Sequence, residues 1–382
     1  MKKNKKILFL INNLSFFLSH RLPIAEALFA KGFDIFIGYG ELRGADPKLL
    51  EQKGFNVNFV PMKPGSISLL SELKTFFLIW KLFRKIKPNI VHLVTIRPYL
   101  YGGIVSRLTG IKCLVSAVSG LGTLFIHNNL KSRFLRLLLY PIYRLAFNHS
   151  NQKIILQNNE DKKLLVNWGV LHKSKIQLIN GSGVRLENFL NLDEPNGIPL
   201  ISFAGRLLKD KGVYDFVSAA RLFKERGIKA QFYLIGDLDV NNPSSLNIKD
   251  LKMIIQEGYV KVLGYQKDIP SLYAKSNIIC LPSYREGLPK GLIEAAAASR
   301  AVVTTDVPGC RDAIIPNETG LLVPVKNPQK LANALQWLIE NPNKRIAMGK
   351  AGRKLAEKEF QIQKIVQGHF DIYQELLSKE LN

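Results

Sequence analysis

The chain has 382 residues, which suggests two domains at about 100–200 residues per domain. Hydrophobic residues make up 47% of it and charged residues 22%, which excludes a disordered or fibrous protein. The 54 Lys and Arg against 30 Asp and Glu give a formal charge of +24, so we expect an anionic partner: nucleic acid, an acidic membrane surface or a phosphorylated substrate. Three cysteines without a CxxC pair predict neither a disulfide framework nor structural zinc, and they favour a reducing cytoplasm.

The positive charge is concentrated in the first half of the chain. Residues 1–190 contain 28 Lys and Arg and 9 Asp and Glu, whereas residues 191–382 contain 26 and 21. Between Glu72 and Glu160 there are 13 Lys and Arg and no acidic residue. We therefore expect the first half of the protein to face an anionic surface or ligand.

Apolar runs typical of buried parallel strands alternate with helical patterns along the whole chain. This βαβ alternation predicts an α/β fold of two doubly wound domains, each with a parallel sheet covered by helices on both faces. Helical patterns such as those at 22–31, 214–226 and 328–340 separate the strands. The predicted strands are 6–11, 34–37, 57–60, 90–94, 112–117, 153–157 and 176–179 in the first domain, and 200–204, 231–235, 260–263, 278–281, 301–304 and 320–323 in the second.

A turn-rich segment at 193–199 marks the expected domain boundary. The sequence thus predicts a first domain at residues 1–190, a second domain at residues 191–361 and a last helix at residues 362–382. Because no strand follows this helix, we expect it to pack back on the first domain. No stretch reaches the ~20 apolar residues that a membrane-spanning helix needs.

Two stretches of the first domain have the pattern of basic amphipathic helices. Residues 69–87 repeat apolar side chains at helical spacing, and residues 130–147 interleave Lys131, Arg133 and Arg136 with aromatic and aliphatic residues. Such helices lie on anionic membranes, where each cation contributes about 1 kcal/mol. The alternative is an ordinary helix with its apolar side on the core and its cations in water. The lack of acidic residues between Glu72 and Glu160 favours the membrane.

The segments that follow the strands are the candidate sites, because doubly wound sheets bind ligands beyond the carboxyl ends of their strands. After the strand at 200–204, Arg206 and Lys211 lie between two glycines just before a helix. Arginine can bind a diphosphate through paired hydrogen bonds, and lysine can bind it as a point charge. The alternative is a solvated turn with basic residues.

Two glutamates follow the strand at 278–281. Glu286 is expected at a glycine-rich helix start and Glu294 two turns later on the same side, so that the first amides of the helix, from Gly287 to Gly291, favour an anion. The apolar residues around Glu294 predict a buried helix, in which a carboxylate needs a partner. Two carboxylates beside an anion site suit a ligand with hydroxyl and phosphate groups, such as a sugar nucleotide.

The Glu286 to Glu294 element, the Arg206 to Lys211 loop and the segment at 181–189 together resemble the retaining glycosyltransferases of group 1 (family 4). Further matches at 306–312 and 320–324 follow in the same order, so the resemblance spans nearly the whole chain. It implies the GT-B architecture, in which a cleft separates two Rossmann-like domains. It also implies a UDP-sugar as co-substrate, with no metal ion and no other cofactor.

The resemblance assigns a role to each residue of the second domain. Arg206 and Lys211 bind the donor diphosphate, Glu286 contacts hydroxyls of the donor sugar, and Glu294 binds the ribose. Glu286, Arg206 and Lys211 are thus the expected catalytic residues. The remaining donor-binding positions, which supply backbone amides or lie beside the base, are Gly287, Leu288, Pro289 and Tyr265.

One position departs from the family pattern. Many relatives have a His-Gly pair where this chain has Ser119-Gly120, and a serine cannot do the proton chemistry of a histidine at neutral pH. Retaining transfer is thought to use the departing diphosphate oxygen as the proton acceptor, so that the protein supplies positioning and charge stabilisation. His20, which follows Ser15 after the first strand, is a candidate substitute; the alternative is a helix-start histidine without a catalytic role.

Three segments, at 19–28, 92–98 and 119–122, narrow the resemblance to bacterial enzymes that add N-acetylhexosamines to undecaprenyl-diphosphate-linked sugars. The implied partners are a UDP-sugar, a polyprenyl-diphosphate-linked acceptor and the anionic inner face of the cytoplasmic membrane, where the protein would be cytoplasmic and peripheral. The alternatives are a soluble transferase with a small or glucan acceptor, a UDP-N-acetylhexosamine 2-epimerase, and a sugar-nucleotide-binding protein without catalysis. We expect no nucleic acid partner, because no reader motif accompanies the charge.

Overall fold

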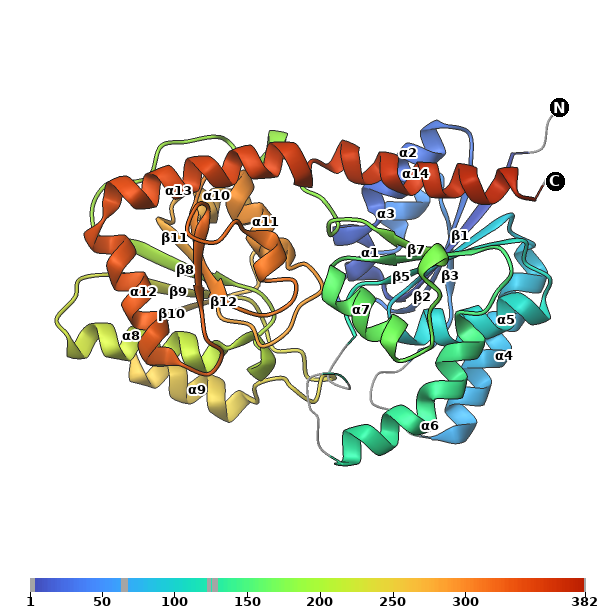
Figure 1. The fold of residues 1–382 in the computed structure, drawn as a ribbon, viewed down its shortest axis with the longest axis horizontal. Coiled ribbons are helices and arrows are strands. Elements are labelled where there is room, and N and C mark those ends of the chain that lie inside the picture. The colour runs from blue at the N-terminus through green and yellow to red at the C-terminus, as the bar shows by residue number, and fades with distance from the viewer. Residues whose placement is uncertain (1–3, 63–67, 122–124, 126–129, 381–382) are drawn as a thin grey trace. The chain divides into compact units, whose positions relative to one another are not determined.

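The computed structural model describes residues 4–62, 68–121, 125 and 130–380, without the side chains of Leu69 and Lys131 (Figure 1). Close contacts divide the chain into two compact units. Unit 1 consists of Met1–Ser182 and Gln363–Asn382, and unit 2 consists of Gly183–Ile362. The chain therefore passes between the units twice, at residues 182–183 and at residues 362–363.

Unit 1 contains, among its described residues, a seven-stranded parallel sheet in the order β3-β2-β1-β4-β5-β6-β7. The order extends in both directions from the neighbours β1 and β4, which is the doubly wound arrangement. The strands are β1 (Lys6–Asn13), β2 (Asp34–Glu41), β3 (Asn56–Phe59), β4 (Ile90–Val94), β5 (Cys113–Val118), β6 (Gln152–Leu156) and β7 (Ile176–Leu178). The helices are α1 (Leu14–His20), α2 (Leu22–Ala30), α3 (Lys48–Glu51), α4 (Leu69–Ile86), α5 (Gly103–Leu108), α6 (Leu130–Ala146), α7 (Asn159–Asn167) and α14 (Ile362–Ser378).

The two faces of this sheet are buried by different helices. Phe9 of β1 belongs to a core cluster with residues of α1, α2 and α14, whereas the adjacent Leu8 and Leu10 belong to a cluster with residues of α4, α5 and α6. Successive side chains of a strand point to opposite faces. Because both faces are covered, the strand is a continuous apolar run instead of an alternating one.

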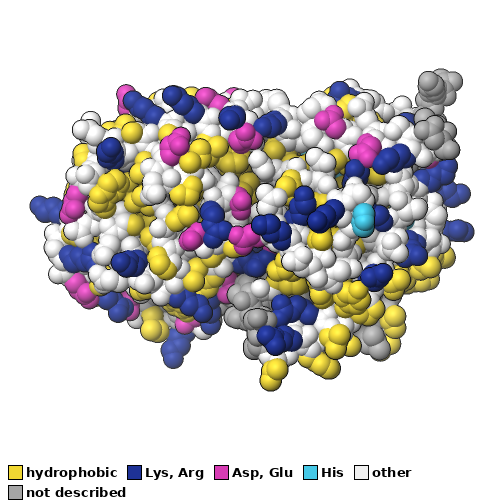
Figure 2. All heavy atoms as spheres, viewed as in Figure 1, with side chains coloured by type: hydrophobic (Ala, Val, Ile, Leu, Met, Phe, Trp, Pro, Cys, Tyr) yellow, Lys and Arg dark blue, Asp and Glu magenta, His cyan; other side chains and the backbone are white. Residues whose placement is uncertain are grey.

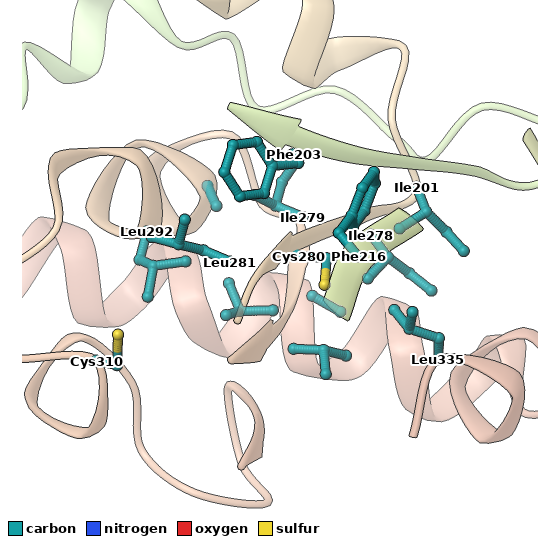
Figure 3. Packing of buried hydrophobic residues seen from close by; sticks show 14 of the residues in the cluster. Ile201, Phe203, Phe216, Ile278, Ile279, Cys280, Leu281, Leu292, Cys310 and Leu335 are labelled. Carbon is teal, nitrogen blue, oxygen red and sulfur yellow. The ribbon is translucent and has the colours of Figure 1, made fainter. Parts of the chain in front are cut away.

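Unit 2 contains, among its described residues, a six-stranded parallel sheet in the order β10-β9-β8-β11-β12-β13, again doubly wound. Figure 3 shows part of its single core, where Phe203 and Phe216 lie near Ile201 and Ile279. The strands are β8 (Leu200–Ala204), β9 (Gln231–Ile235), β10 (Lys261–Gly264), β11 (Ile278–Leu281), β12 (Ala301–Thr305) and β13 (Gly320–Val323). The helices are α8 (Val213–Glu225), α9 (Ile248–Glu257), α10 (Ile269–Ala274), α11 (Lys290–Ala297), α12 (Pro328–Glu340) and α13 (Pro342–Leu355).

The last helix, α14, packs on unit 1, as expected from the sequence. Its residues Ile372 and Leu376 are buried with strand residues of that unit. The Asn151 side chain donates a hydrogen bond to the Leu376 carbonyl at 2.9 Å, and Lys153 pairs with Glu375 at 2.9 Å. Asn151 directly precedes β6 and Lys153 is its second residue, so both contacts fasten the end of α14 to the start of β6.

The turn-rich segment before β8 is held firmly against unit 2. Glu194 forms a paired salt bridge with Arg345, at 2.6 Å for the shortest contact, and both side chains are buried. The buried Arg300 donates to the carbonyls of Leu192 and Asp193. At least four side-chain hydrogen bonds therefore fix this segment to unit 2. The first passage between the units, at residues 182–183, lies before it in the chain.

All thirteen predicted strands are present in the described part of the chain, and five of them have the predicted bounds: 90–94, 200–204, 231–235, 278–281 and 320–323. The two predicted basic helices form as α4 and α6. No helix of the described residues is long and apolar enough to span a membrane. Cys113, Cys280 and Cys310 are free and buried.

Candidate active site

The loop after β8 carries the two predicted cations of unit 2. Lys211 lies in a short 3-10 turn, and Gly212 is the N-cap of α8. The Lys211 Nζ lies 2.6 Å from Oε1 of Glu286, which is in the loop after β11. β8 and β11 are neighbours in the sheet, so their carboxyl ends bring these loops together. The structure thus unites two of the three residues that were predicted to be catalytic.

The Lys211–Glu286 pair is mostly shielded from water. The side chains are 18% and 15% exposed, and the Ser283 hydroxyl donates to the same Oε1 at 2.8 Å. A charge-assisted contact in such surroundings is stronger than one at the open surface. Ser283 was not singled out in the sequence, although it too directly follows β11.

Arg206, the third predicted catalytic residue, lies at the start of the same β8 loop. Its Nη1 bonds Oδ2 of Asp239 at 2.7 Å, and about half of its side chain is exposed, whereas Asp239 is buried. Asp239 follows β9, the neighbour of β8, and the sequence analysis missed it. The rule that ligands bind beyond carboxyl ends of strands would have included it.

The close approach of these two loops depends on Gly236, at the end of β9. Its φ is +140°, and a Cβ at this position would lie 1.9 Å from the Gly205 carbonyl oxygen. Only glycine permits this contact. The glycine that directly follows β9 therefore has a direct effect on where Arg206 and Asp239 meet.

The helix start expected at Glu286 is wrong. Helix α11 begins at Lys290 with Pro289 as its N-cap, so Glu286 lies in a loop and does not share a helical face with Glu294. Pro289 has an extended backbone, with φ −71° and ψ 121°, which keeps the preceding residues out of the helix. Gly287 and the buried Leu288 are therefore loop residues as well, and their amides are not the first amides of α11.

Glu294 lies on α11, as predicted, and is largely buried. Burial raises the pKa of its carboxyl group, and the nearby Lys290, with Nζ at 3.3 Å, opposes this effect. The expectation that a buried carboxylate here needs a partner is confirmed by this ion pair. Lys290 is an additional charged residue that the sequence analysis did not single out.

The Glu286 loop rests on the segment at 306–312 that contributed to the family resemblance. The Glu286 amide donates to the Pro308 carbonyl at 3.3 Å, and Gly309 has a φ of +79°. A Cβ on Gly309 would lie 2.6 Å from the Glu286 carbonyl oxygen. This segment thus fixes the backbone of the candidate site, and only a residue without a side chain fits at Gly309.

Tyr265 lies after β10 and is mostly exposed. Its amide donates to Oδ1 of Asp237 at 3.0 Å, so the loop after β10 is tied to the loop after β9. In the described residues, no hydrogen bond or ring contact joins its side chain to the Lys211–Glu286 pair. Among the described residues, no group of three or more His, Cys, Asp and Glu is placed to hold a metal ion.

The four candidate residues of unit 1 lie beyond the carboxyl ends of its central strands. The half-buried His20 closes α1, where its ring stacks on Phe16 and its Nδ1 bonds the Ser19 hydroxyl at 2.6 Å. That hydroxyl also donates to the Ser15 carbonyl, so Ser15 enters through its backbone. Ser119 and Gly120 follow β5, and both are half-buried.

The sequence analysis missed Arg21, a buried residue that connects the end of α1 with the segment after β5. Arg21 lies between α1 and α2, where its Nη1 donates to the His20 carbonyl at 2.9 Å and its Nη2 lies 3.5 Å from the Ser119 hydroxyl. A sequence cannot show that an arginine in an amphipathic helical pattern is buried, so no local signal identified it.

Of the membrane-surface candidates, Arg133 and Arg136 lie on α6, and the Lys131 side chain is outside the described part of the structure. Arg133 is exposed, and Arg136 lies over the Phe125 ring at 5.9 Å. The helix forms where the charge pattern predicted it, and it carries Arg133 and Arg136.

Two parallel doubly wound units, with cations and carboxylates beyond the carboxyl ends of the unit 2 strands, define a GT-B glycosyltransferase. The family model for "Glycosyl transferases group 1" matches residues 185–355, and that for "Glycosyl transferase 4-like" matches residues 6–158. The chain belongs to the group 1 glycosyltransferases and is an enzyme of that class.

Named relatives match over most of the chain. An N,N'-diacetylbacillosaminyl-diphospho-undecaprenol alpha-1,3-N-acetylgalactosaminyltransferase from Campylobacter jejuni is 27% identical over 358 residues, covering 87% of this chain and 91% of that protein. A UDP-Gal:alpha-D-GlcNAc-diphosphoundecaprenol alpha-1,3-galactosyltransferase from Escherichia coli is 28% identical and covers 82% of each chain. The solved sucrose-phosphate synthase from Thermosynechococcus elongatus shares the fold, with a TM-score of 0.80 at 20% identity, over 98% of this chain and 100% of its own.

Proposed function

We propose that the protein transfers an N-acetylhexosamine, such as GalNAc or GlcNAc, from a UDP-sugar to a saccharide carried on undecaprenyl diphosphate. The transfer retains the anomeric configuration and needs no metal ion. The observation that carries this proposal is the Lys211–Glu286 ion pair at the carboxyl ends of β8 and β11, with Arg206 on the same β8 loop. The product would be an intermediate in the assembly of a glycan, O-antigen or capsule.

Arg206 and Lys211 suit the diphosphate of the donor. Arg206 uses only Nη1 in its bond with Asp239, so its other guanidinium nitrogens can bond phosphoryl oxygens. Lys211 has three donors, of which the bond with Glu286 takes one. Glu286 can then accept hydrogen bonds from sugar hydroxyls, while its ion pair keeps the Lys211 ammonium group in place.

The two cations also account for chemistry without a metal ion. In the transfer, the acceptor hydroxyl oxygen forms a bond to C1 of the sugar while the bond from C1 to the diphosphate oxygen breaks. The hydroxyl proton goes to that departing oxygen, and UDP leaves. Fixed positive charges beside the diphosphate stabilise the negative charge that develops on it, as a divalent cation does in other transferases.

Glu294 and Tyr265 complete the proposed donor site. Glu294 is a largely buried carboxylate of the kind that binds a ribose diol. In the absence of donor it forms an ion pair with Lys290. Tyr265 presents an exposed ring beyond β10, where it can lie against a uracil base. The backbone of Gly287, Leu288 and Pro289 would support the phosphate and the sugar.

The acceptor class rests on the activities for which two relatives are named and on the charge of unit 1. The names of the Campylobacter jejuni and Escherichia coli proteins both specify a sugar on diphosphoundecaprenol. Residues 1–190 carry 28 Lys and Arg against 9 Asp and Glu. A basic unit is suited to an acceptor with a diphosphate in an anionic membrane, so we propose a peripheral position on the cytoplasmic face of the inner membrane.

The outer face of α6 supports this position. Five of its six large exposed apolar residues recur at helical spacing on one side, away from the buried Tyr143 and Ala146; they are Leu130, Phe134, Leu137, Leu138 and Leu145, and the sixth, Leu135, lies beside this row. An ordinary surface helix turns its apolar side to the core instead. A stripe of this kind, with Arg133 and Arg136 on the same helix, fits the interface of an anionic bilayer.

Helix α4 presents a second exposed apolar row, formed by Leu70, Leu73 and Phe77. Figure 2 shows hydrophobic and basic side chains together at the lower right, over the part of unit 1 where Figure 1 draws α4 and α6. Membrane contact through two helices would bury more apolar surface than contact through one, and each buried side chain contributes about 1.5–3 kcal/mol when fully removed from water.

The test is turnover with a panel of UDP-sugars and a short-chain polyprenyl-diphosphate-linked N-acetylhexosamine. Mass spectrometry detects the added sugar, the proton NMR coupling of the new anomeric hydrogen reports retention, and EDTA tests the need for a metal. We expect one N-acetylhexosamine donor to give product with retained configuration and undiminished rate in EDTA. UDP binding without product from any donor would instead indicate a sugar-nucleotide-binding protein without catalysis.

A further inference from the structure

Arg21 is a cation in the interior of unit 1. It is 2% exposed, and burial lowers its pKa to about 10, so it stays charged at neutral pH. Its Nη1 donates to the His20 carbonyl, and its Nη2 points to the Ser119 hydroxyl at 3.5 Å. The buried Nε has no hydrogen-bond partner among the described residues.

No carboxylate of the described residues balances this charge. Arg21 has no ion pair with a described residue, and the undescribed residues contain no Asp or Glu side chain. Its polar neighbours on the same side of the sheet are His92, His369 and Tyr373, all of which burial keeps neutral near pH 7. A buried charge without a counter-charge is unfavourable, so a ligand that brings a negative charge near it is strongly favoured.

Ser119 is the route by which this charge can reach a ligand. The Ser119 oxygen faces the guanidinium and accepts from it, so the hydroxyl hydrogen must point elsewhere. No described residue accepts that hydrogen. Unlike Arg21, Ser119 is half-buried, and it follows β5, beyond the carboxyl end of a central strand, where doubly wound sheets bind ligands.

We propose that Ser119, polarised by the buried Arg21, donates a hydrogen bond to a phosphoryl oxygen of a diphosphate ligand. In this arrangement Ser119 binds substrate and Arg21 is a positioning residue that also supplies the counter-charge. The inference rests on the proposed function, in which both substrates contain a diphosphate. The serine then replaces the histidine of many relatives with a hydrogen-bond donor that needs no proton transfer.

Calorimetry tests this without turnover. The probes are UDP alone, and farnesyl diphosphate added to protein saturated with UDP, so that the second probe reports on a site other than the donor site. We expect Ser119→Ala to weaken farnesyl diphosphate binding about tenfold, as for loss of a charge-assisted hydrogen bond, and Ser119→Thr to retain it. The matched control is Ser150→Ala, which removes an exposed serine just before β6, at the amino ends of the strands and so away from the carboxyl ends where Ser119 lies.

Two arms identify the source of the diphosphate. A loss confined to farnesyl diphosphate assigns the site to the lipid acceptor, and a loss confined to UDP assigns it to the donor; both support a phosphoryl site at Ser119. Arg21→Met should reproduce the loss if it folds, and Arg21→Lys should restore part of it. The proposal is overturned if Ser119→Ala binds both probes as the wild type does, whereas absence of turnover with normal binding refutes only the transferase assignment.

Discussion

Lys211 and Glu286 form a nearly buried ion pair, with Nζ 2.6 Å from Oε1, although 75 residues separate them in the chain. They come from the loops after two neighbouring parallel strands, β8 and β11. The carboxylate therefore holds the lysine in position before any donor binds. A cation that is already oriented costs less entropy when the diphosphate arrives.

Substitution of either partner should reduce transfer at least tenfold, because each removes a charge-assisted contact of about 1.5–3 kcal/mol. Lys211→Ala should be worse than Glu286→Gln, since it leaves an unpaired carboxylate facing the donor phosphates. In the double variant that carboxylate is absent, so its loss should be smaller than the product of the single losses. Steady-state kinetics with saturating acceptor measure all three; near-normal rates in both single variants would remove the pair from the donor site.

Gly309→Ala should impair the site while the fold persists. The new Cβ would lie 2.6 Å from the Glu286 carbonyl oxygen, so the Glu286 loop must move. We expect a tenfold or greater fall in transfer rate. Gly258→Ala is the matched control, because Gly258 also has a positive φ, +68°, but nothing lies within 4 Å of its added Cβ.

Both variants should lose about 1–2 kcal/mol of stability from the left-handed backbone. Only Gly309→Ala should lose activity as well. Thermal unfolding and transfer assays on the two proteins separate the effects, and equal activity losses would mean that backbone strain alone is responsible.

Serine at three exposed positions of α6, Phe134, Leu137 and Leu138, should reduce binding to phosphatidylglycerol vesicles tenfold or more. These side chains lose the gain from burial in the bilayer interface. The control replaces Ile248, Met253 and Ile255, which are exposed on α9 of unit 2, with serine. Vesicle flotation measures the bound fraction.

The cations of the same helix should determine how binding depends on salt. Neutralising Lys131, Arg133 and Arg136 together should weaken binding at low ionic strength and flatten its decline as salt rises, because screening acts on the removed charges. If both the serine and the neutralised variants partition like the wild type, α6 is not the membrane contact.

Stability should fall as the pH drops below about 6.5. Burial lowers the pKa of His92, His149 and His369, in the last case to about 3. At His92 and His369 the unfolded chain binds a proton near pH 6.5 and the folded chain does not, so each of these two lowers the unfolding free energy by about 1.4 kcal/mol per pH unit below that point. His149 adds to this loss only until the pH reaches its own folded pKa. The loss for His369 continues until the pH approaches its folded pKa.

Urea unfolding at pH 7.5 and pH 5.0 measures this effect in a range where few carboxylates titrate. His369→Leu should reduce the difference between the two conditions. A stability that stays constant or increases towards pH 5.0 would show that these side chains are accessible to protons in the folded protein.

Most central strands were predictable because helices cover both faces of each sheet, which makes a strand such as Ile278–Leu281 a continuous, fully buried apolar run. The start of α11 was not predictable, since Gly287 and Leu288 before Pro289 suit a loop as well as a helix. Contacts between distant segments were out of reach for a further reason. Arg206 meets Asp239, and Arg21 meets Ser119. Both contacts depend on which strands are neighbours and on how the loops after them turn.

The most direct test of the site at Arg206 and Lys211 compares the affinities of UDP and uridine for the wild-type protein. If these two cations recognise the donor diphosphate, UDP should bind at least a hundredfold more tightly than uridine, for two charge-assisted contacts of about 1.5–3 kcal/mol each. The ratio should collapse in the Arg206→Ala, Lys211→Ala double variant. Equal affinities of the wild type for UDP and uridine would contradict the donor site and the function proposed from it.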